Sequence, residues 1–334
     1  MHASLHPILS DEQVAALEVL TGAPRVILTG HVRPDGDCIG AQAALSRLLQ
    51  ARGQTVHILN PDLPETRYSY LSNDVTYGAD EGQALPEHDL IVLLDCSELS
   101  RTGSLAERFE ASDAQKVIVD HHVLPDVMWW DAAFHDQTAS STGLLVARIA
   151  AAIGQELDTL SARGVFTSMV TDTGWFKYSN TDAETLGLAS ELVRLGVDPS
   201  EMFQAIYQHQ PDHHPRSVGR LLSGVRYECG GRLALLPLPL GTDGRPQVVD
   251  TDDALDLVRS VENVEVVLLV RQVTSNLCKL SARSKTTFNV NRLAQQFGGG
   301  GHVKASGAAI EGNVTEVCQQ LVAAVDSMWE AVDA

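Results

Sequence analysis

Short apolar runs alternate with helical patterns through the first half of this 334-residue chain. Runs rich in Val, Ile and Leu predict strands at residues 25–29, 55–59, 90–94 and 116–119. Between the first two, residues 38–51 carry Ala, Leu and Ile at helical spacing, and Gly53 follows the end of this predicted helix. This alternation of strand and helix is typical of an α/β fold with a doubly wound, mainly parallel sheet.

The pattern changes near residue 208. Helical spacing dominates from about residue 142 to residue 222, but the polar segment 208–215 contains two prolines and predicts a loop. Further strands are predicted at 224–228, 233–237, 264–271 and 276–282, and helices at 289–297 and 314–332. We therefore predict a doubly wound domain at 1–207, a linker at 208–223 and a smaller α+β domain at 224–334.

Acidic and histidine residues follow the predicted strands of the first domain. They are His31, Asp35 and Asp37 after the first strand, Asp95 after the third, Asp120, His121 and His122 after the fourth, and Asp172 after a helical stretch. Ligands of open α/β sheets bind at the carboxyl ends of the strands, so we expect these segments to converge. Clustered carboxylates repel one another unless cations neutralise them, and aspartates with imidazoles are typical of a two-metal hydrolytic site.

Several of these residues also have a simpler interpretation. Asp35-Gly36-Asp37 taken alone is a common solvated turn. Asp95 ends a buried run, where a carboxylate needs a partner, so we predict that it bridges two cations rather than capping the next segment. Arg101 could clamp a phosphate or be a plain surface arginine. Asp172 could be a metal ligand or a helix cap.

The triplet Asp120-His121-His122 places three polar groups at the end of a buried strand. Adjacent residues of an extended backbone point in opposite directions, so we expect one histidine to bind metal and its neighbour to face the substrate. Asp120 then suits a role in orienting the ligating imidazole. A second triplet, Asp212-His213-His214, follows no apolar run, and we interpret it as part of the linker.

A glycine run near the carboxyl terminus predicts an anion-binding loop. Gly298, Gly299, Gly300 and Gly301 lack side chains, so their N–H groups can press against an anion. Nearby polar residues would complete a basic pocket: Arg283 and Ser284 near a strand end, and His302 and Lys304 after the glycines. A flexible loop is the alternative.

Composition narrows the choice of partners and compartment. The net charge of −19, from 43 acidic and 24 basic residues, argues against binding long nucleic acids and fits a small phosphorylated substrate. No apolar stretch is long enough to span a membrane, and the amino terminus does not resemble a signal peptide. The five scattered cysteines indicate reduced thiols, so we expect a cytoplasmic protein. The sequence does not determine the oligomeric state, and a homodimer is compatible with it.

Taken together, these residues resemble the motifs of the DHH phosphoesterase superfamily, specifically its two-domain bacterial nanoRNase and pAp-phosphatase type. The likeness covers nearly the whole chain. His31-x-x-x-Asp35-x-Asp37, Asp95, Asp120-His121-His122 and Asp172 follow the order of the four family motifs, and Gly299-Gly300-Gly301-His302 matches the signature of the DHH-associated domain. One departure is Ser306, in a position where the family often has alanine, which affects only fine substrate preference.

The resemblance implies a role for each residue. His31 and Asp35 would hold one divalent cation, Asp37, His121 and Asp172 would hold the other, and Asp95 would be shared. His122 would contact the scissile phosphate. Arg283, Ser284, the glycines and His302 would bind the far end of the substrate, and the active-site cleft would lie between the two domains. The oxygen-rich ligands favour Mn²⁺, with Mg²⁺ as the alternative, and we take Cys38 and Cys96 as incidental because thiolates would favour zinc.

The implied activity is hydrolysis of short 5′-phosphorylated oligonucleotides, linear dinucleotides and 3′-phosphoadenosine-5′-phosphate by two-metal activation of water. A phosphodiesterase dedicated to dinucleotide second messengers would use the same site. A family II pyrophosphatase lacks the glycine loop, and a RecJ-type exonuclease needs more chain. A nonhydrolytic nucleotide-binding protein would be expected to lack some of the ligands, and none is missing here.

Overall fold

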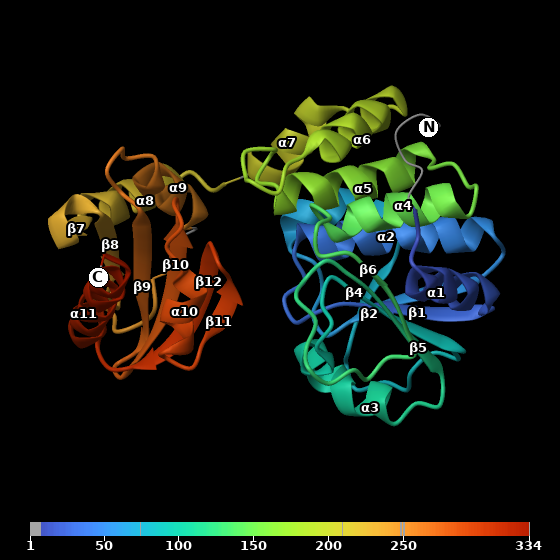
Figure 1. The fold of residues 1–334 in the computed structure, drawn as a ribbon, viewed down its shortest axis with the longest axis horizontal. Coiled ribbons are helices and arrows are strands. Elements are labelled where there is room, and N and C mark those ends of the chain that lie inside the picture. The colour runs from blue at the N-terminus through green and yellow to red at the C-terminus, as the bar shows by residue number, and fades with distance from the viewer. Residues whose placement is uncertain (1–7, 74, 209, 248, 250, 334) are drawn as a thin grey trace. The chain divides into compact units, whose positions relative to one another are not determined.

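The chain forms two compact units, Met1–His209 and Gln210–Ala334, in a computed structural model (Figure 1). The structure describes residues 8–73, 75–208, 210–247, 249 and 251–333. Among these residues, no helix combines the length and the apolar character needed to cross a membrane.

The first unit contains a six-stranded sheet in the order β3-β2-β1-β4-β5-β6, and every neighbouring pair is parallel. The strands are β1 Arg25–Thr29, β2 Thr55–Asn60, β3 Tyr77–Ala79, β4 Leu90–Leu94, β5 Gln115–Asp120 and β6 Ala132–His135. The predicted doubly wound, mainly parallel sheet is therefore confirmed. The two strands that the pattern missed, β3 and β6, have only three and four residues, too few for a recognisable apolar run.

Both faces of this sheet are covered. The helical elements are α1 Asp11–Gly22, α2 Gly36–Ala51, η1 Thr66–Asn73, η2 Leu99–Leu105, α3 Ala106–Glu110, α4 Thr142–Ala152, α5 Thr159–Asp172, α6 Ala183–Arg194 and α7 Pro199–Tyr207. On one face, Val26 and Leu28 of β1 pack in a core that includes α1, α2, α4 and α5. On the other, Ile27 packs against Leu105 and Phe109 around α3. Successive side chains of β1 thus pack into two cores on opposite faces of the sheet, because side chains alternate between the faces of a pleated strand.

The order of the strands determines where a ligand-binding site is expected. The chain runs outward from β1 through β2 to β3, then returns to the other side of β1 for β4, β5 and β6. The order therefore reverses between β1 and β4. In open α/β sheets the ligand crevice lies at the carboxyl ends of the strands beside this reversal. His31 follows β1 and Asp95 follows β4, so both lie at this point.

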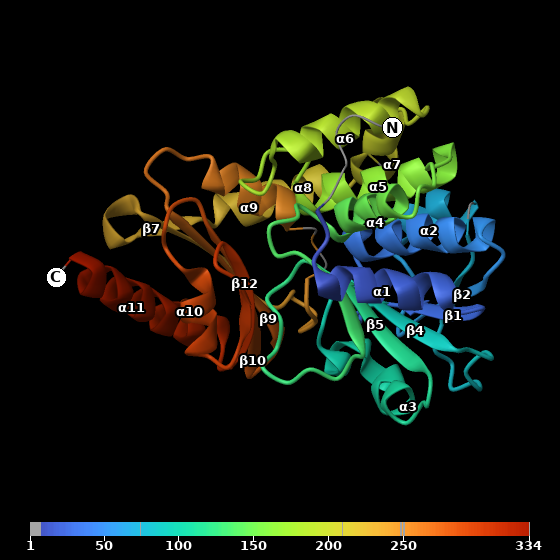
Figure 2. The same cartoon turned by 45° about the vertical axis from the view of Figure 1, so that its right-hand side comes forward.

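The second unit contains a smaller mixed sheet in the order β11-β12-β10-β9-β8-β7, in which only the β8–β9 pair is parallel. Its strands are β7 Arg226–Glu228, β8 Leu233–Leu238, β9 Val266–Thr274, β10 Leu277–Ser284, β11 Gly300–His302 and β12 Ala305–Glu311. Its helices are α8 His214–Ser223, η3 Cys229–Gly231, α9 Asp252–Arg259, α10 Val290–Gln295 and α11 Val314–Asp333. Helices α8 and α9 pack on one face, and α10 and α11 on the other (Figure 2).

Most of the predicted linker 208–223 is instead helix. Helix α8 occupies His214–Ser223, and Leu221 is buried in the core beneath α8 and α9. The polar residues at its start masked the apolar stripe formed by Val218, Leu221 and Leu222. The triplet Asp212-His213-His214 thus leads into this helix, where His214 Nε2 lies 3.2 Å from Asp253 Oδ2.

Candidate active site

The turn after β1 brings two predicted ligands together. His31 Nδ1 lies 2.9 Å from the carbonyl oxygen of Val32, so Nδ1 donates and Nε2 is the nitrogen left to bind a cation. That Nε2 faces Asp95 Oδ2 at 3.5 Å and Asp35 Oδ2 at 3.9 Å. Asp35 is the N-cap of α2, where its carboxylate accepts the N–H groups of Asp37 and Cys38. This cap fixes the direction in which the helix leaves the turn.

Asp95 is placed between two groups of donors. It follows β4 directly with φ +62°, a conformation that aspartate tolerates, and its side chain is 3% exposed. Its Oδ2 faces His31, whereas its Oδ1 lies 3.7 Å from both His121 Nε2 and His122 Nδ1. The two oxygens of one buried carboxylate therefore point to two different sets of ligands, as a bridging ligand requires.

The second set gathers around His121. Its Nδ1 lies 3.1 Å from the carbonyl oxygen of Ala139, so this nitrogen donates, and Nε2 faces Asp37 Oδ2 at 3.4 Å and Asp172 Oδ2 at 3.7 Å. This Nε2 is buried and has no hydrogen-bond partner among the described residues. A buried imidazole nitrogen that faces carboxylates without a hydrogen bond can bind a cation placed between them, so the oxygen and imidazole donors here fit a divalent metal.

Crowding of these groups shifts their pKa values. Burial raises the pKa of Asp37 to about 6, and the neighbouring Asp95 adds to the rise. Burial lowers the pKa of His121, but the carboxylates of Asp37 and Asp95 outweigh it and raise that pKa to about 12. Burial also opposes ionisation of Asp95, yet His121 and His31 hold its pKa well below the usual range. A cation that binds here therefore displaces protons, and its affinity depends on pH.

The start of α4 holds Asp37 in place. The backbone N–H of Thr142 donates to both oxygens of Asp37, each at 3.0 Å. The hydroxyl of Ser168, on α5, donates to Asp37 Oδ1 and accepts the N–H of Gly143 at 2.6 Å. The positive end of α4 and a buried hydroxyl therefore stabilise this carboxylate.

His122 and Asp120 form a separate pair beside Asp95. Asp120 is fully buried, and its Oδ1 accepts both the backbone N–H of His122, at 3.1 Å, and the ring Nδ1, at 2.8 Å. Burial lowers the pKa of His122, but Asp120 outweighs it and raises that pKa to about 9. Asp120 thus orients His122. The sequence analysis predicts instead that Asp120 orients the imidazole that binds metal.

Arg101 is exposed in η2, and its carbonyl oxygen accepts the N–H of Val32 at 2.8 Å. The segment that carries Arg101 is therefore tied to the turn after β1, although within the described part of the chain the Arg101 side chain makes no hydrogen bond or ion pair with the proposed metal ligands. Cys38 lies within 4.8 Å of donor atoms of His31 and Asp95, but burial raises its pKa well above the usual value and keeps it a neutral thiol.

The candidate substrate residues of the second unit lie at one end of its sheet. Arg283 of β10 and His302 of β11 both pair with Ala305 of β12, and the N–H of Ser284 donates to the carbonyl oxygen of the exposed Lys304 at 3.0 Å. The His302 side chain lies outside the described part of the structure. Gly299 and Gly301 are packed tightly, since a Cβ on Gly299 would lie 2.1 Å from the oxygen of Gly307. Gly300 is open, with its nearest atom 3.9 Å from such a Cβ.

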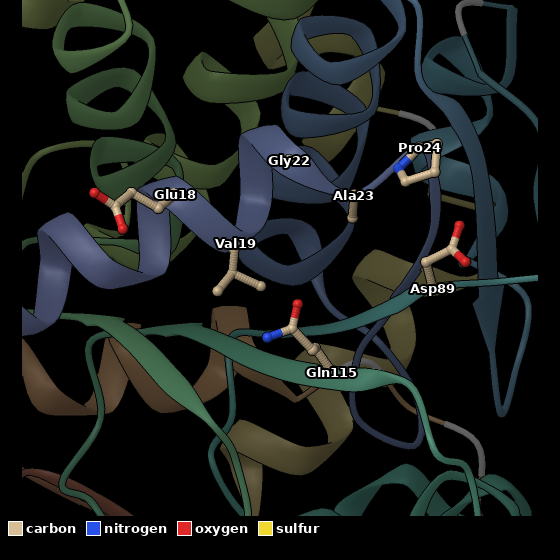
Figure 3. A pocket seen from close by; sticks show the side chains of 7 residues that line it. All are labelled: Glu18, Val19, Gly22, Ala23, Pro24, Asp89 and Gln115. Atoms are coloured by element: carbon tan, nitrogen blue, oxygen red, sulfur yellow. The ribbon is translucent and has the colours of Figure 1, made fainter.

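A hollow elsewhere on the first unit is lined by Glu18, Val19, Gly22, Ala23, Pro24, Asp89 and Gln115 (Figure 3). Pro24 and Asp89 precede β1 and β4, and Gln115 begins β5. The hollow therefore lies at the amino ends of these parallel strands, the opposite end from the ligands. Asp89 is already paired with Arg25 at 2.7 Å.

Comparison with known proteins identifies the family of this chain. Residues 25–169 match the model of the DHH family, N-terminal domain, and residues 246–331 match the DHHA1 domain. The bifunctional oligoribonuclease and PAP phosphatase NrnA of Thermus thermophilus is 31% identical over 86% of this chain and 84% of its own length. The chain belongs to the DHH family. The resemblance found in its motifs is thereby confirmed.

A second relative and a solved structure are also similar to this chain. The bifunctional oligoribonuclease and PAP phosphatase NrnA of Bacillus subtilis is 28% identical over 85% of this chain and 89% of its own length. The crystal structure of an exopolyphosphatase-related protein from Bacteroides fragilis has a TM-score of 0.86, covers 98% of this chain and 100% of its own, and is 24% identical. That structure shares the fold.

In this DHH chain the sequence alone did not identify the residues that hydrogen-bond to the predicted metal ligands and keep them in position. The sequence patterns do not single out Thr142, Ser168 or Asn180 for this role. Thr142 and Ser168 lie far from Asp37 in the sequence, so no local pattern connects them. Asn180 lies near Asp172, but asparagine is a common polar residue. The one local signal was Ser-Ser-Thr-Gly at 140–143, which predicts a helix start.

Proposed function

We propose that this DHH protein is a metal-dependent phosphoric ester hydrolase that acts on short 5′-phosphorylated oligonucleotides and on 3′-phosphoadenosine-5′-phosphate. The observation that carries this proposal is the placement of Asp95, whose Oδ2 faces His31 and whose Oδ1 faces His121. The two NrnA relatives, each matched over most of its length, support the substrate class.

The distances between the donors support two cation positions. His31, Asp35 and Asp95 would hold one ion, and Asp37, His121, Asp172 and Asp95 the other. The carboxylate oxygens favour Mn²⁺ or Mg²⁺. Such ions lower the pKa of a bound water and offset the charge of the phosphate oxygens.

The protein's own groups supply orientation and a proton. Because Asp120 binds Nδ1 of His122, Nε2 is the ring nitrogen that can donate to a phosphate oxygen or to a leaving group. The raised pKa of His122, about 9, keeps the imidazole protonated at neutral pH and suits this role. Arg101 would add a contact to phosphate from η2.

Charge distribution favours a short substrate. Residues 1–209 contain 29 acidic and 12 basic side chains, whereas residues 210–334 contain 14 and 12. A strongly acidic catalytic unit repels a long polyanion, so attraction is confined to the cations and to a few basic residues. We propose that Arg283, Ser284, Gly299, Gly300, Gly301, His302 and Lys304 contact the terminal phosphate or base of the substrate.

The test is product analysis on a length series of 5′-labelled RNAs, from dinucleotides upward, with added Mn²⁺, alongside 3′-phosphoadenosine-5′-phosphate. We expect rapid release of mononucleotides from the shortest RNAs and phosphate release from the bisphosphate. Asp95→Asn should abolish both activities, while Asp212→Asn, the same change at an exposed aspartate, should abolish neither. Hydrolysis of linear dinucleotides alone would favour the dedicated dinucleotide phosphodiesterase. Nucleotide binding without turnover would contradict an enzyme.

A further inference from the structure

The carboxylates around His121 are held to different degrees. The side chains of Asp37 and Asp95 are only 2% and 3% exposed, and donors from α4 and α5 bind them. Asp172 is the last residue of α5, and its side chain is 32% exposed. A ligand at a helix end needs support from outside the helix if its carboxylate is to keep one orientation.

Asn180 supplies that support. Its Nδ2 donates to Asp172 Oδ2 at 3.3 Å, to the backbone oxygen of Asp172 at 3.2 Å and to the backbone oxygen of Ser140 at 3.0 Å. Three acceptors around one nitrogen define which end of the amide faces the site. Asp172 Oδ2 is also the atom that faces His121 Nε2, so Asn180 holds the oxygen that would bind the cation.

The contact to Ser140 extends this support to Asp37. Ser140 immediately precedes Ser141, the N-cap of α4, and the first N–H groups of α4 bind Asp37. Asn180 therefore joins the end of α5, which carries Asp172, to the start of α4. Its Oδ1 is buried without a hydrogen-bond partner among the described residues, a cost that the protein tolerates to keep Nδ2 in place.

We propose that Asn180 is a positioning residue that sets the affinity of the cation position formed by Asp37, His121 and Asp172. This inference rests on the proposed two-metal function. Loss of the amide frees the Asp172 carboxylate and leaves two backbone oxygens without their donor. Loss of an outer partner of a metal ligand typically weakens metal binding by about 10–100-fold.

A separate contact supports the other position, and we infer that Asp62 has the corresponding role there. Arg33 has φ +54°, a conformation unfavourable for arginine and more so before a proline. Its N–H donates to Asp62 Oδ2 at 2.7 Å, which holds the turn between His31 and Asp35 in this conformation. Because this bond is exposed, its loss should weaken cation binding at this position by only about fivefold.

The two residues can be tested against each other by titrating the metal-free full chain with Mn²⁺ and measuring free Mn²⁺ by electron paramagnetic resonance. In the parent protein we expect two bound ions, with His31→Gln removing one class of site and Asp172→Asn the other. Asn180→Ala should weaken by about 10–100-fold only the class that Asp172→Asn removes. Asp62→Ala should weaken only the class that His31→Gln removes, and Asp62→Asn, which keeps an acceptor, should restore it.

Equal weakening of both classes by either variant, or unchanged affinities in a folded variant, would overturn the inference for that residue. Asn180→Leu, which fills similar volume without a donor, replaces Asn180→Ala if the latter does not fold. A parent protein that binds fewer than two Mn²⁺ ions would instead contradict the proposed function itself, so the two failures are distinguishable.

Discussion

Gly143 lies where α4 meets α5, and adding one methyl group there tests how the site is held. A Cβ on Gly143 would lie 2.2 Å from Ser168 Oγ, 2.5 Å from Ser168 Cβ and 3.1 Å from the backbone oxygen of Val165. Real side chains do not approach so closely, so α4 has to move away from α5. The move would pull the N–H groups of Thr142 and Gly143 away from their partners.

The expected cost of Gly143→Ala is about 2–4 kcal/mol of unfolding free energy. Overpacking of a buried contact costs about 1–3 kcal/mol, and each weakened hydrogen bond adds about 1 kcal/mol. Urea unfolding followed by tryptophan fluorescence measures the loss, because three of the four tryptophans lie in the first unit. Mn²⁺ binding should weaken in parallel, since Asp37 loses donors that fix its position.

Gly187→Ala on α6 is the matched control. A Cβ on Gly187 would meet no atom within 4 Å, so this change should stabilise the helix by about 0.5–1 kcal/mol. It should leave Mn²⁺ binding unchanged. If Gly143→Ala were as stable as Gly187→Ala and bound Mn²⁺ normally, the claim that α4 and Ser168 hold Asp37 would be refuted.

Three further predictions concern other parts of the site. His122→Asn should lower kcat by about 10²–10⁴-fold with Mn²⁺ binding retained, whereas His213→Asn in the second triplet should not; equal rates would exclude His122 from the chemistry. The pKa of His121 is raised to about 12, so its stabilisation of the metal-free protein is full below pH 6.5 and falls as pH rises toward 12. Bound Mn²⁺ displaces that proton, so the rise in melting temperature caused by Mn²⁺ should grow from pH 6 to pH 9, and a flat profile would contradict this. Gly299→Ala should destabilise the second unit, because its Cβ would lie 2.1 Å from a β12 oxygen, whereas Gly300→Ala should fold and raise KM; an unchanged KM would exclude contact with substrate.

The central strands and the ligands that follow them could be predicted because their signals are local. Val26 to Leu28 and Leu90 to Leu94 form continuous apolar runs, and His31 and Asp95 come after them. The edge strands β3 and β6 are too short to leave such a pattern. The residues of helix α8 were assigned to a linker because polar residues and prolines surround its start, although Leu221 is buried.

The residues that support the ligands could not be predicted for a different reason. Ser168 and Asp37 are 131 positions apart, and their contact depends on how closely α2, α4 and α5 pack. Asn180 is close to Asp172 in sequence, but a lone asparagine in a turn carries no specific signal. Such contacts follow from tertiary structure, which a single sequence pattern does not specify.

The central claim is that two cations share Asp95, and anomalous diffraction from crystals grown with Mn²⁺ tests it most directly. The account predicts two manganese peaks, one bound by His31, Asp35 and Asp95 and the other by Asp37, His121, Asp172 and Asp95. A single peak, or two peaks of which one does not contact Asp95, would contradict it.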